Sequence, residues 1–296
     1  MTEPIQLMPP QQSEFRRVLR GLRKSRTSLL GALIFSFYVF VAILSPFITP
    51  HDPNKQNLRG RLAPPVGFGL ENAQMDYPLG TDNLGRDILS RLIVGSRISL
   101  MVAVTTVALA CSIGSIIGAM AGFYRGWFDN IVMRLVDIWM AFPPLLLAIV
   151  FGTVLGQGLA NLILALVLTN WVIYSRVIRA EALVLREQEF VQATHALGAS
   201  NARIIVRHIL PNVFSSMLVI ATLQLSTVIV AEASLSFLGI TVQGSVPTWG
   251  GMLADGREYI RESWWFATFP GIAISVVVLS ANLLGDGLRD TLDPRL

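Results

Sequence analysis

The chain of 296 residues has 53% hydrophobic and only 14% charged side chains, a formal net charge of +4 and a mean hydropathy of +0.58. This composition excludes an ordinary soluble globular protein and indicates that lipid is the main solvent. Because Cys111 is the single cysteine, an intrachain disulfide and a cysteine metal site are excluded. The basic residues in excess are almost all arginine, and in a membrane protein they bear on the orientation of the chain in the membrane more than on binding of nucleic acid.

The chain begins with a basic tail at residues 1–27, followed by a first apolar stretch at residues 28–50. This stretch is long enough to cross a bilayer core of roughly 30 Å as a helix of about 20 residues. It follows a polar tail and is longer than the roughly 7 to 15 apolar residues of a cleavable signal. We therefore expect it to remain in the mature protein as the first transmembrane helix.

Residues 51–97 separate the first span from the second. They are rich in proline and glycine at the start and helix-like over residues 83–96, so we predict a periplasmic loop followed by a short amphipathic helix. Two roles remain open for this segment. It is either a contact surface for a substrate or binding protein, or a connector between a peripheral first helix and the rest of the bundle.

The remaining chain contains a core at residues 98–290 and a short tail at residues 291–296. The apolar runs are continuous, which favours an all-α polytopic membrane protein over a β-barrel. With the N-terminus inside, fifteen Lys and Arg residues lie on the inner side and eight on the outer side, so both ends are predicted to be cytoplasmic. The five core spans are predicted at about 98–122, 129–153, 157–176, 212–240 and 263–285.

Three ionisable side chains lie inside the predicted spans. Each should face protein or water, because a charge in lipid costs on the order of 2.5 to 3.5 kcal/mol. Arg134 and Asp137 are three residues apart on one helix, and we expect them to form a structural ion pair. Glu232 has no local partner, and two roles stay open for it: lining a translocation path or bonding a neighbouring helix.

Glycines and prolines also shape the predicted spans. Gly114, Gly118 and Gly122 form two overlapping small-xxx-small motifs, which allow another helix to approach closely. Pro143 and Pro144 interrupt the third span and should bend it. Such a bend serves either gating or the shape of the bundle.

The inner loop at residues 177–210 has the pattern of two short helices. Phe190, Thr194 and Leu197, with Ala193, form an apolar stripe at helical spacing, and Gly198 then breaks the helix. A second apolar run ends where a proline opens the next span. The pattern indicates a docking element, and an ordinary interfacial linker is the other interpretation.

The sequence carries no recognisable catalytic or cofactor chemistry. Neither lysine, Lys24 or Lys55, follows a glycine, so a phosphate loop ending in Gly-Lys-Ser/Thr is missing. The histidines lie outside the predicted spans and form no metal-binding pair, and no catalytic triad stands out. We therefore expect a non-catalytic chain that holds no metal and no cofactor of its own.

The inner loop resembles the signature of permeases in binding-protein-dependent ABC importers. That signature is Glu-Ala-Ala, three residues, Gly, nine residues, Ile, one residue, and Leu-Pro. The spacing is kept throughout, and the departures are Gln192 for Glu, Thr194 for Ala and His208 for Ile. The residues at which the resemblance implies contact with an ATPase are Gln192, Ala193, Thr194, Leu197, Gly198, Leu210 and Pro211.

Three further motifs resemble the second permease of dipeptide, oligopeptide, glutathione and nickel importers. They read Leu-Gly-Thr-Asp-Asn-Leu-Gly-Arg-Asp at 79–87, Ser-Leu-Ser-Phe-Leu-Gly at 234–239, and Asn-Leu-Leu-Gly-Asp-Gly-Leu-Arg-Asp at 282–290, with Leu-Asp-Pro following at 292–294. The stretch at 242–250 departs from the group, which usually shows a proline pair after the glutamine. The resemblance extends from about residue 31 to residue 296.

The resemblance implies a type I ABC importer permease fold, with one N-terminal helix and a five-helix core, in the bacterial inner membrane. It implies a second homologous permease as heterodimer partner, two P-loop ATPases that hold ATP and Mg²⁺, and a periplasmic or lipid-anchored substrate-binding protein. It gives no role to nucleic acid. The cargo stays open among peptides, opines, glutathione, haem and nickel chelates.

Two other function classes fit the sequence less well. An ion-driven secondary transporter should show an internal repeat and several charges near the middle of the membrane. An intramembrane enzyme should show a paired acid, a metal site or a nucleophile inside the spans. Within the importer interpretation, Gly198 is predicted to be irreplaceable because a side chain there would widen the turn between the two short helices.

Overall fold

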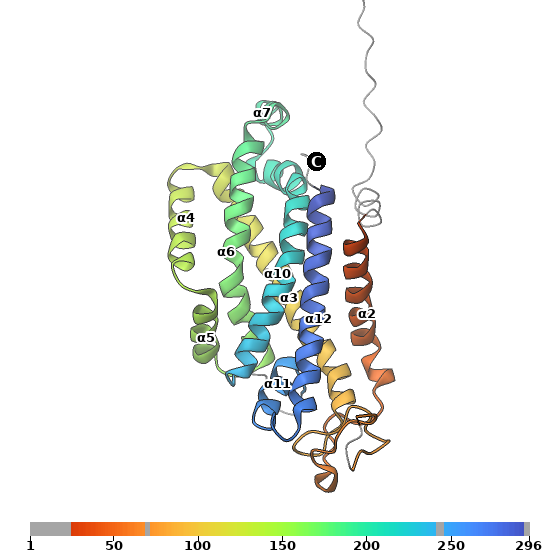
Figure 1. Ribbon diagram of the computed structural model, residues 1–296. Coiled ribbons are helices and arrows are strands. Elements are labelled where there is room, and N and C mark those ends of the chain that lie inside the picture. The colour runs from red at the N-terminus through yellow and green to blue at the C-terminus, as the bar shows by residue number, and fades with distance from the viewer. Residues whose placement is uncertain (1–24, 69–71, 241–245, 293–296) are drawn as a thin grey trace, which may run out of the picture.

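The computed structural model describes residues 25–68, 72–240 and 246–292 (Figure 1). Within these ranges the regular elements are helices, and the single β-type feature is an isolated bridge between Thr81 and Asp87. The predicted all-α fold is therefore confirmed. Most of the basic tail, residues 242–245 of the departing stretch and the motif end at 293–294 lie outside the described residues.

Five of the described helices are long and apolar enough to cross a membrane, and a bent pair of shorter helices makes six if it is counted as one span. The pair consists of α4 (Gly126–Met140) and α5 (Pro144–Leu155), which meet at an angle of 93°. The five long helices are α2 (Arg26–Ile48), α3 (Ile88–Tyr124), α6 (Leu159–Arg186), α10 (Phe214–Phe237) and α12 (Trp264–Leu292).

The break between α4 and α5 follows from the proline pair. Pro143 has an extended ψ of 130° because the ring of the next proline disfavours the helical conformation before it. Pro144 then occupies the first turn of α5, where its missing N–H leaves no hydrogen bond unmade. The third span is thus two helices rather than one kinked helix.

Helix α3 differs from the prediction: it starts later than residue 83 and continues without a break to Tyr124. It is one helix of 37 residues in place of an amphipathic helix at 83–96 and a separate span. Asp87 caps its start: the carboxylate accepts hydrogen bonds from the backbone N–H groups of Leu89 at 3.2 Å and Ser90 at 3.1 Å. Residues 83–87 therefore form a loop, in which Gly85 takes a φ of +72°.

The inner loop is more helical than predicted. Helix α6 continues ten residues past the expected end at 176, and α7 (Glu189–Ala196) projects from one end of the bundle (Figure 1). A second helical run follows, made of α8 (Asn201–Ile204), a π-helical turn (Ile205–Ile209) and α9 (Leu210–Asn212).

Three apolar clusters hold the described helices together, and the third joins Ile88, Met252 and Phe266 of α3, α11 and α12. The first joins α3, α6, α10 and α12 through fully buried residues such as Val102, Leu166 and Val228. The second lies at the α7 end, where Ile204 and Ile209 are fully buried. The second run after α7 is therefore anchored on the bundle, while the opposite end holds the loop after α2 and the short helix α11 (Trp249–Arg257) (Figure 1).

Candidate functional site

Helix α7 turns most of its predicted docking residues away from the bundle. Val191 is buried against α6 and the second run, whereas Gln192, Ala193 and Leu197 are exposed. The side chain of Leu197 is 89% exposed at the C-terminal end of the helix. Of the apolar stripe expected on α7, Leu197 is thus free, whereas the ring of Phe190 lies 6.4 Å from that of His208.

The amide of Gln192 serves the local backbone. Its Nε2 donates a hydrogen bond to the carbonyl oxygen of Glu187 at 3.2 Å, which the glutamate of the usual signature cannot do when it is ionised. The Glu187 carboxylate in turn forms an ion pair with Arg125 at 2.6 Å. Thr194 donates to the carbonyl of Phe190 at 2.7 Å, so two of the three departures from the signature form hydrogen bonds with the backbone of α7 and the turn before it.

Gly198 ends α7 in a left-handed conformation with a φ of +82°. Its N–H donates to the carbonyl of His195 at 3.0 Å, and the next N–H, of Ala199, donates to that of Thr194 at 3.3 Å. This is the Schellman arrangement that favours glycine after a helix. A β-carbon on Gly198 would meet nothing within 4 Å. The prediction that a side chain at Gly198 would widen the turn is therefore wrong. Glycine is required there by the backbone conformation and not by a lack of space.

We expect Gly198→Ala to cost about 1 to 2 kcal/mol locally, because alanine is strained in the left-handed region, and Gly198→Asn to cost less. If the free energy of local opening of α7 falls by 1 kcal/mol, its backbone amides exchange with solvent about fivefold faster. Hydrogen exchange of the α7 amides by mass spectrometry would measure this effect. Equal exchange rates in the alanine and asparagine variants would contradict the conformational explanation.

Leu210 and Pro211 lie apart from the exposed face of α7. Leu210 packs against the buried cluster around Ile209, and Pro211 is at the first turn of α9. With Ser112, Ser115 and Phe214 they line an open cavity of about 590 Å³ between α3 and the start of α10. The structure therefore divides the predicted coupling residues into an exposed group on α7 and an anchored group at α9.

The glycines of α3 face α6 in a regular register. A β-carbon on Gly114 would lie 2.3 Å from the carbonyl oxygen of Trp171, and one on Gly118 would lie 2.4 Å from that of Ser175. Ser175 also donates a hydrogen bond to the carbonyl of Gly114 at 3.0 Å. Both glycines thus occupy helix-packing positions, and neither has room for a side chain.

Glu232 is 1% exposed and connects three helices. Its carboxylate accepts hydrogen bonds from Ser236 on α10 at 3.0 Å and from Ser99 on α3 at 3.3 Å. The Ser99 hydroxyl accepts from the backbone N–H of Trp249, the first residue of α11, at 3.3 Å. Of the two roles left open for Glu232, this geometry supports the bonding of neighbouring helices.

We expect Glu232→Gln to keep assembly and transport, because the amide oxygen can accept the hydrogen bond from Ser236 and the amide N–H can donate to the hydroxyl oxygen of Ser99. Glu232→Leu leaves buried hydroxyl groups without their acceptor, which costs about 1 to 3 kcal/mol. Thermal unfolding of the purified protein in detergent, followed with substrate uptake, would separate the two variants. A glutamine variant that is as stable as wild type but fails to transport would instead place the charge of Glu232 in the transport mechanism.

The expected ion pair between Arg134 and Asp137 is not present. Asp137 Oδ1 pairs with Nη2 of Arg176 on α6, and within the described residues Arg134 forms no ion pair. Both side chains are exposed on α4, and Asp137 meets the guanidinium group that the neighbouring helix α6 supplies. Eight residues earlier on α4, Asp129 makes a bidentate pair with Arg179 at 2.9 and 2.5 Å.

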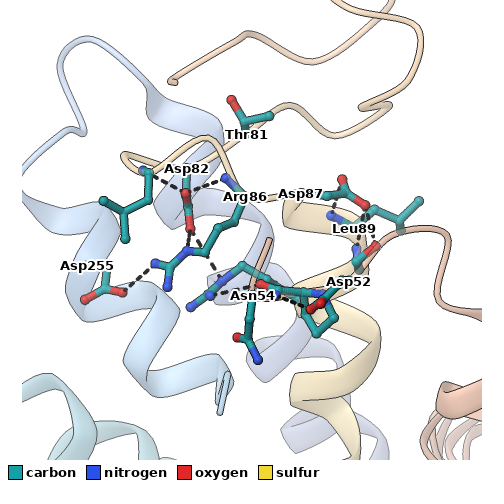
Figure 2. Close-up of polar contacts among 12 residues, drawn as sticks. Asp52, Asn54, Thr81, Asp82, Arg86, Asp87, Leu89 and Asp255 are labelled. Carbon is teal, nitrogen blue, oxygen red and sulfur yellow. Dashed lines mark hydrogen bonds and ion pairs between the residues drawn. The ribbon is translucent and has the colours of Figure 1, made fainter. Parts of the chain in front are cut away.

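A charged network ties the opposite end of the bundle together, as Figure 2 shows. Asp82 is fully buried, accepts backbone hydrogen bonds from Leu84 and Arg86 at 2.9 Å each, and pairs with Arg86 Nε at 2.6 Å. Arg86 reaches Asp255 of α11 at 3.9 Å, and Arg91 donates to the carbonyl of Pro53 at 3.3 Å. The motif at 79–87 therefore fixes two elements to the start of α3, namely helix α11 and the loop that follows α2.

This network was not predicted from the sequence: Asp82 and Arg86 are only four residues apart, but Pro53 and Asp255, which they and Arg91 tie together, are distant along the chain. Partial burial raises the pKa of the Asp255 carboxyl above its ordinary value, and the guanidinium groups of Arg91 and Arg86 act against that shift. Gly85 cannot be replaced in this arrangement, since a β-carbon would lie 1.8 Å from the carbonyl oxygen of Asn57. An aspartate directly before an apolar run was the one local signal of the Asp87 cap.

Comparisons with known proteins agree with this architecture. Residues 113–296 match the family described as binding-protein-dependent transport system inner membrane component, and residues 13–65 match the N-terminal TM domain of oligopeptide transport permease C. A putative peptide transport system permease protein of Brucella suis is 44% identical over 277 residues, which cover 94% of this chain and 90% of the relative.

Two further relatives align over the whole chain. The di/tripeptide transport system permease protein DppC of Pseudomonas aeruginosa is 39% identical, with 96% of the relative covered. The glutathione transport system permease protein GsiD of Escherichia coli is 38% identical, with 94% covered. A structure of the MetNI methionine ABC transporter in inward-facing conformations superposes with a TM-score of 0.54 at 19% identity, over 68% of this chain and 96% of that chain. It confirms the predicted permease fold.

Proposed function

The chain belongs to the family of inner-membrane components of binding-protein-dependent transport systems, and from this premise we propose that it is one of two unlike permease subunits that enclose the translocation path of an ATP-driven peptide importer. The chain itself is a multi-pass membrane transport subunit. Peptides are the proposed cargo because the relatives are named for peptide, dipeptide, di/tripeptide and glutathione transport.

The observation that carries this proposal is the exposed face of α7. The helix is held by Val191, by the hydrogen bonds of Gln192 and by the Gly198 turn, yet it presents Leu197 almost fully to the outside. A firmly held helix with a free apolar residue suits a rigid joint with a second protein. That protein is the ATPase in this proposal, because the sequence has no phosphate-binding loop of its own.

Two ATPases would thus bind ATP and Mg²⁺, and this chain would hold no cofactor and catalyse no reaction. The described chain begins and ends at the α7 end of the bundle (Figure 1), where Arg26, Arg186 and Arg289 also lie at or near the ends of α2, α6 and α12. We place this end in the cytoplasm, following the positive-inside rule. The opposite end, with α11 and the network around Asp82, then faces the binding protein on the periplasmic side.

Uptake by the reconstituted complex tests the proposal. Proteoliposomes that contain both permeases and both ATPases are supplied with a labelled dipeptide and the loaded binding protein. The proposal requires uptake that depends on ATP and the binding protein and persists when ionophores collapse the ion gradients. Uptake that follows an ion gradient without ATP would overturn it in favour of a secondary transporter.

A further inference from the structure

A cavity of about 440 Å³ lies between α7 and the ends of α3 and α6. Phe123 of α3 and Val191 of α7 are buried parts of its lining, whereas Gln192 and His195 of α7 are exposed. The cavity therefore has an apolar inner part and a polar part that is open to the surroundings. It adjoins the helix on which the proposed joint with the ATPase depends.

Arg186, the last residue of α6, brings a positive charge to the lining of this cavity. Its Nη1 donates to the carbonyl oxygen of Phe123 at 2.5 Å, and its guanidinium carbon lies 5.7 Å from the centre of the Phe123 ring. These contacts hold the side chain against the end of α3. A guanidinium group has five N–H donors, and within the described residues the carbonyl of Phe123 is the one acceptor that Arg186 bonds to.

The described part of the chain gives Arg186 no acidic partner. Glu187 also lines the cavity, but its carboxylate forms an ion pair with Arg125 at 2.6 Å. Position 192, where the usual signature has a glutamate, holds a glutamine whose amide bonds to the backbone carbonyl of Glu187. A firmly held positive charge thus remains at the cavity without a counter-charge from the described residues.

We propose that this cavity receives an aspartate or glutamate side chain of the ATPase, whose carboxylate pairs with Arg186. The inference rests on the proposed function, in which α7 docks on that protein. The planar guanidinium group matches a carboxylate with two parallel hydrogen bonds, and charge-assisted bonds of this kind are roughly twice as strong as neutral ones. The apolar lining at Phe123 and Val191 suits the methylene groups of the incoming side chain and shields the ion pair from water.

The glutamine at position 192 fits the same explanation. A glutamate there would bring a second carboxylate to the cavity, and like charges across an interface repel each other. The phosphate of a lipid headgroup is another anion that an arginine binds. The carboxylate of a protein is favoured, because one side of the cavity is formed by α7, which projects from the end of the bundle and away from the spanning helices (Figure 1).

Carbodiimide crosslinking of the reconstituted complex tests the contact. The chain has two lysines, Lys24 and Lys55, so Arg186→Lys adds one amine at a known position. The reagent activates a carboxyl group, and an amine in ion-pair contact displaces the activating group to form an amide. We expect mass spectrometry to find residue 186 joined to an acidic residue of the ATPase.

Arg61→Lys is the matched control, because Arg61 is exposed in the loop at the opposite end of the bundle and should form no link to the ATPase. A lysine at position 186 that links only to residues of this chain, or to none, would overturn the proposal and favour a lipid headgroup as the anion.

Removal of the charge gives a second measurement. Arg186→Gln should reduce the ATPase that co-purifies with the tagged permease about tenfold, because one partner of a shielded ion pair is lost. Arg186→Lys keeps the charge and should retain most of the ATPase. Thermal unfolding of the permease alone shows whether loss of the contact with Phe123 has damaged the fold.

A glutamine variant that retains the ATPase at the wild-type level would overturn the proposal. So would one that loses the ATPase only in proportion to its loss of thermal stability, since Arg186 would then serve to hold the end of α3. A wild-type permease that retains no ATPase would instead refute the proposed function itself.

Discussion

Replacement of Gly118 by leucine is expected to separate α3 from α6 and to reduce the assembled protein in the membrane at least tenfold. The β-carbon alone would lie 2.4 Å from the carbonyl oxygen of Ser175 and 2.9 Å from its Cα, which are backbone atoms and cannot rotate away. Helix pairs in lipid are held mainly by such close packing. Gel filtration of detergent-extracted protein, quantified by a fluorescent tag, measures the loss.

A matched pair of alanine variants controls for the added methyl group. Gly118→Ala should reduce the assembled fraction, whereas Gly271→Ala on α12 should not, because its β-carbon would make an ordinary contact of 3.7 Å with Leu253. If Gly118→Leu accumulates as a single species at the wild-type level, the packing of α3 against α6 described above is incorrect.

Replacement of Leu197 by aspartate is expected to release the ATPases and to reduce peptide uptake at least tenfold without unfolding the permease. The side chain is 89% exposed, so it contributes little to the fold of this chain. A carboxylate at this point would have to be buried without a partner in the joint with the ATPase, at a cost of several kcal/mol. Co-purification of the ATPases with the tagged permease measures the effect.

Met75→Asp is the control for this variant. Met75 is 84% exposed in the loop at the opposite end of the bundle, so its replacement should leave ATPase binding unchanged. Retention of the ATPases by the Leu197→Asp variant would refute the role of α7 as the coupling helix.

The spans were predictable from the sequence because lipid imposes a simple requirement, a long run without charge. The prolines at 143 and 144 likewise indicated the break that separates α4 from α5. The glycine spacing in α3 indicated a close approach but not its partner, since small residues say only that another backbone comes near. That α6 is the partner follows from tertiary structure alone.

The polar contacts were the least predictable part. Arg134 and Asp137 have ideal local spacing, yet Asp137 pairs with Arg176, 39 residues away. Glu232 bonds to Ser99 over a separation of 133 residues. The spacing of three or four residues identifies possible ion pairs within one helix only. It says nothing about a side chain on a neighbouring helix that offers a better geometry.

The most direct measurement is the identification of what binds to this chain in its native membrane. The tagged protein, expressed at its natural level, is purified in mild detergent, and its partners are identified by mass spectrometry. We predict a second six-span permease together with one or two P-loop ATPases. Recovery of the chain alone or as a homo-oligomer, under conditions that keep known importer complexes intact, would contradict its role as one half of an ATP-driven importer.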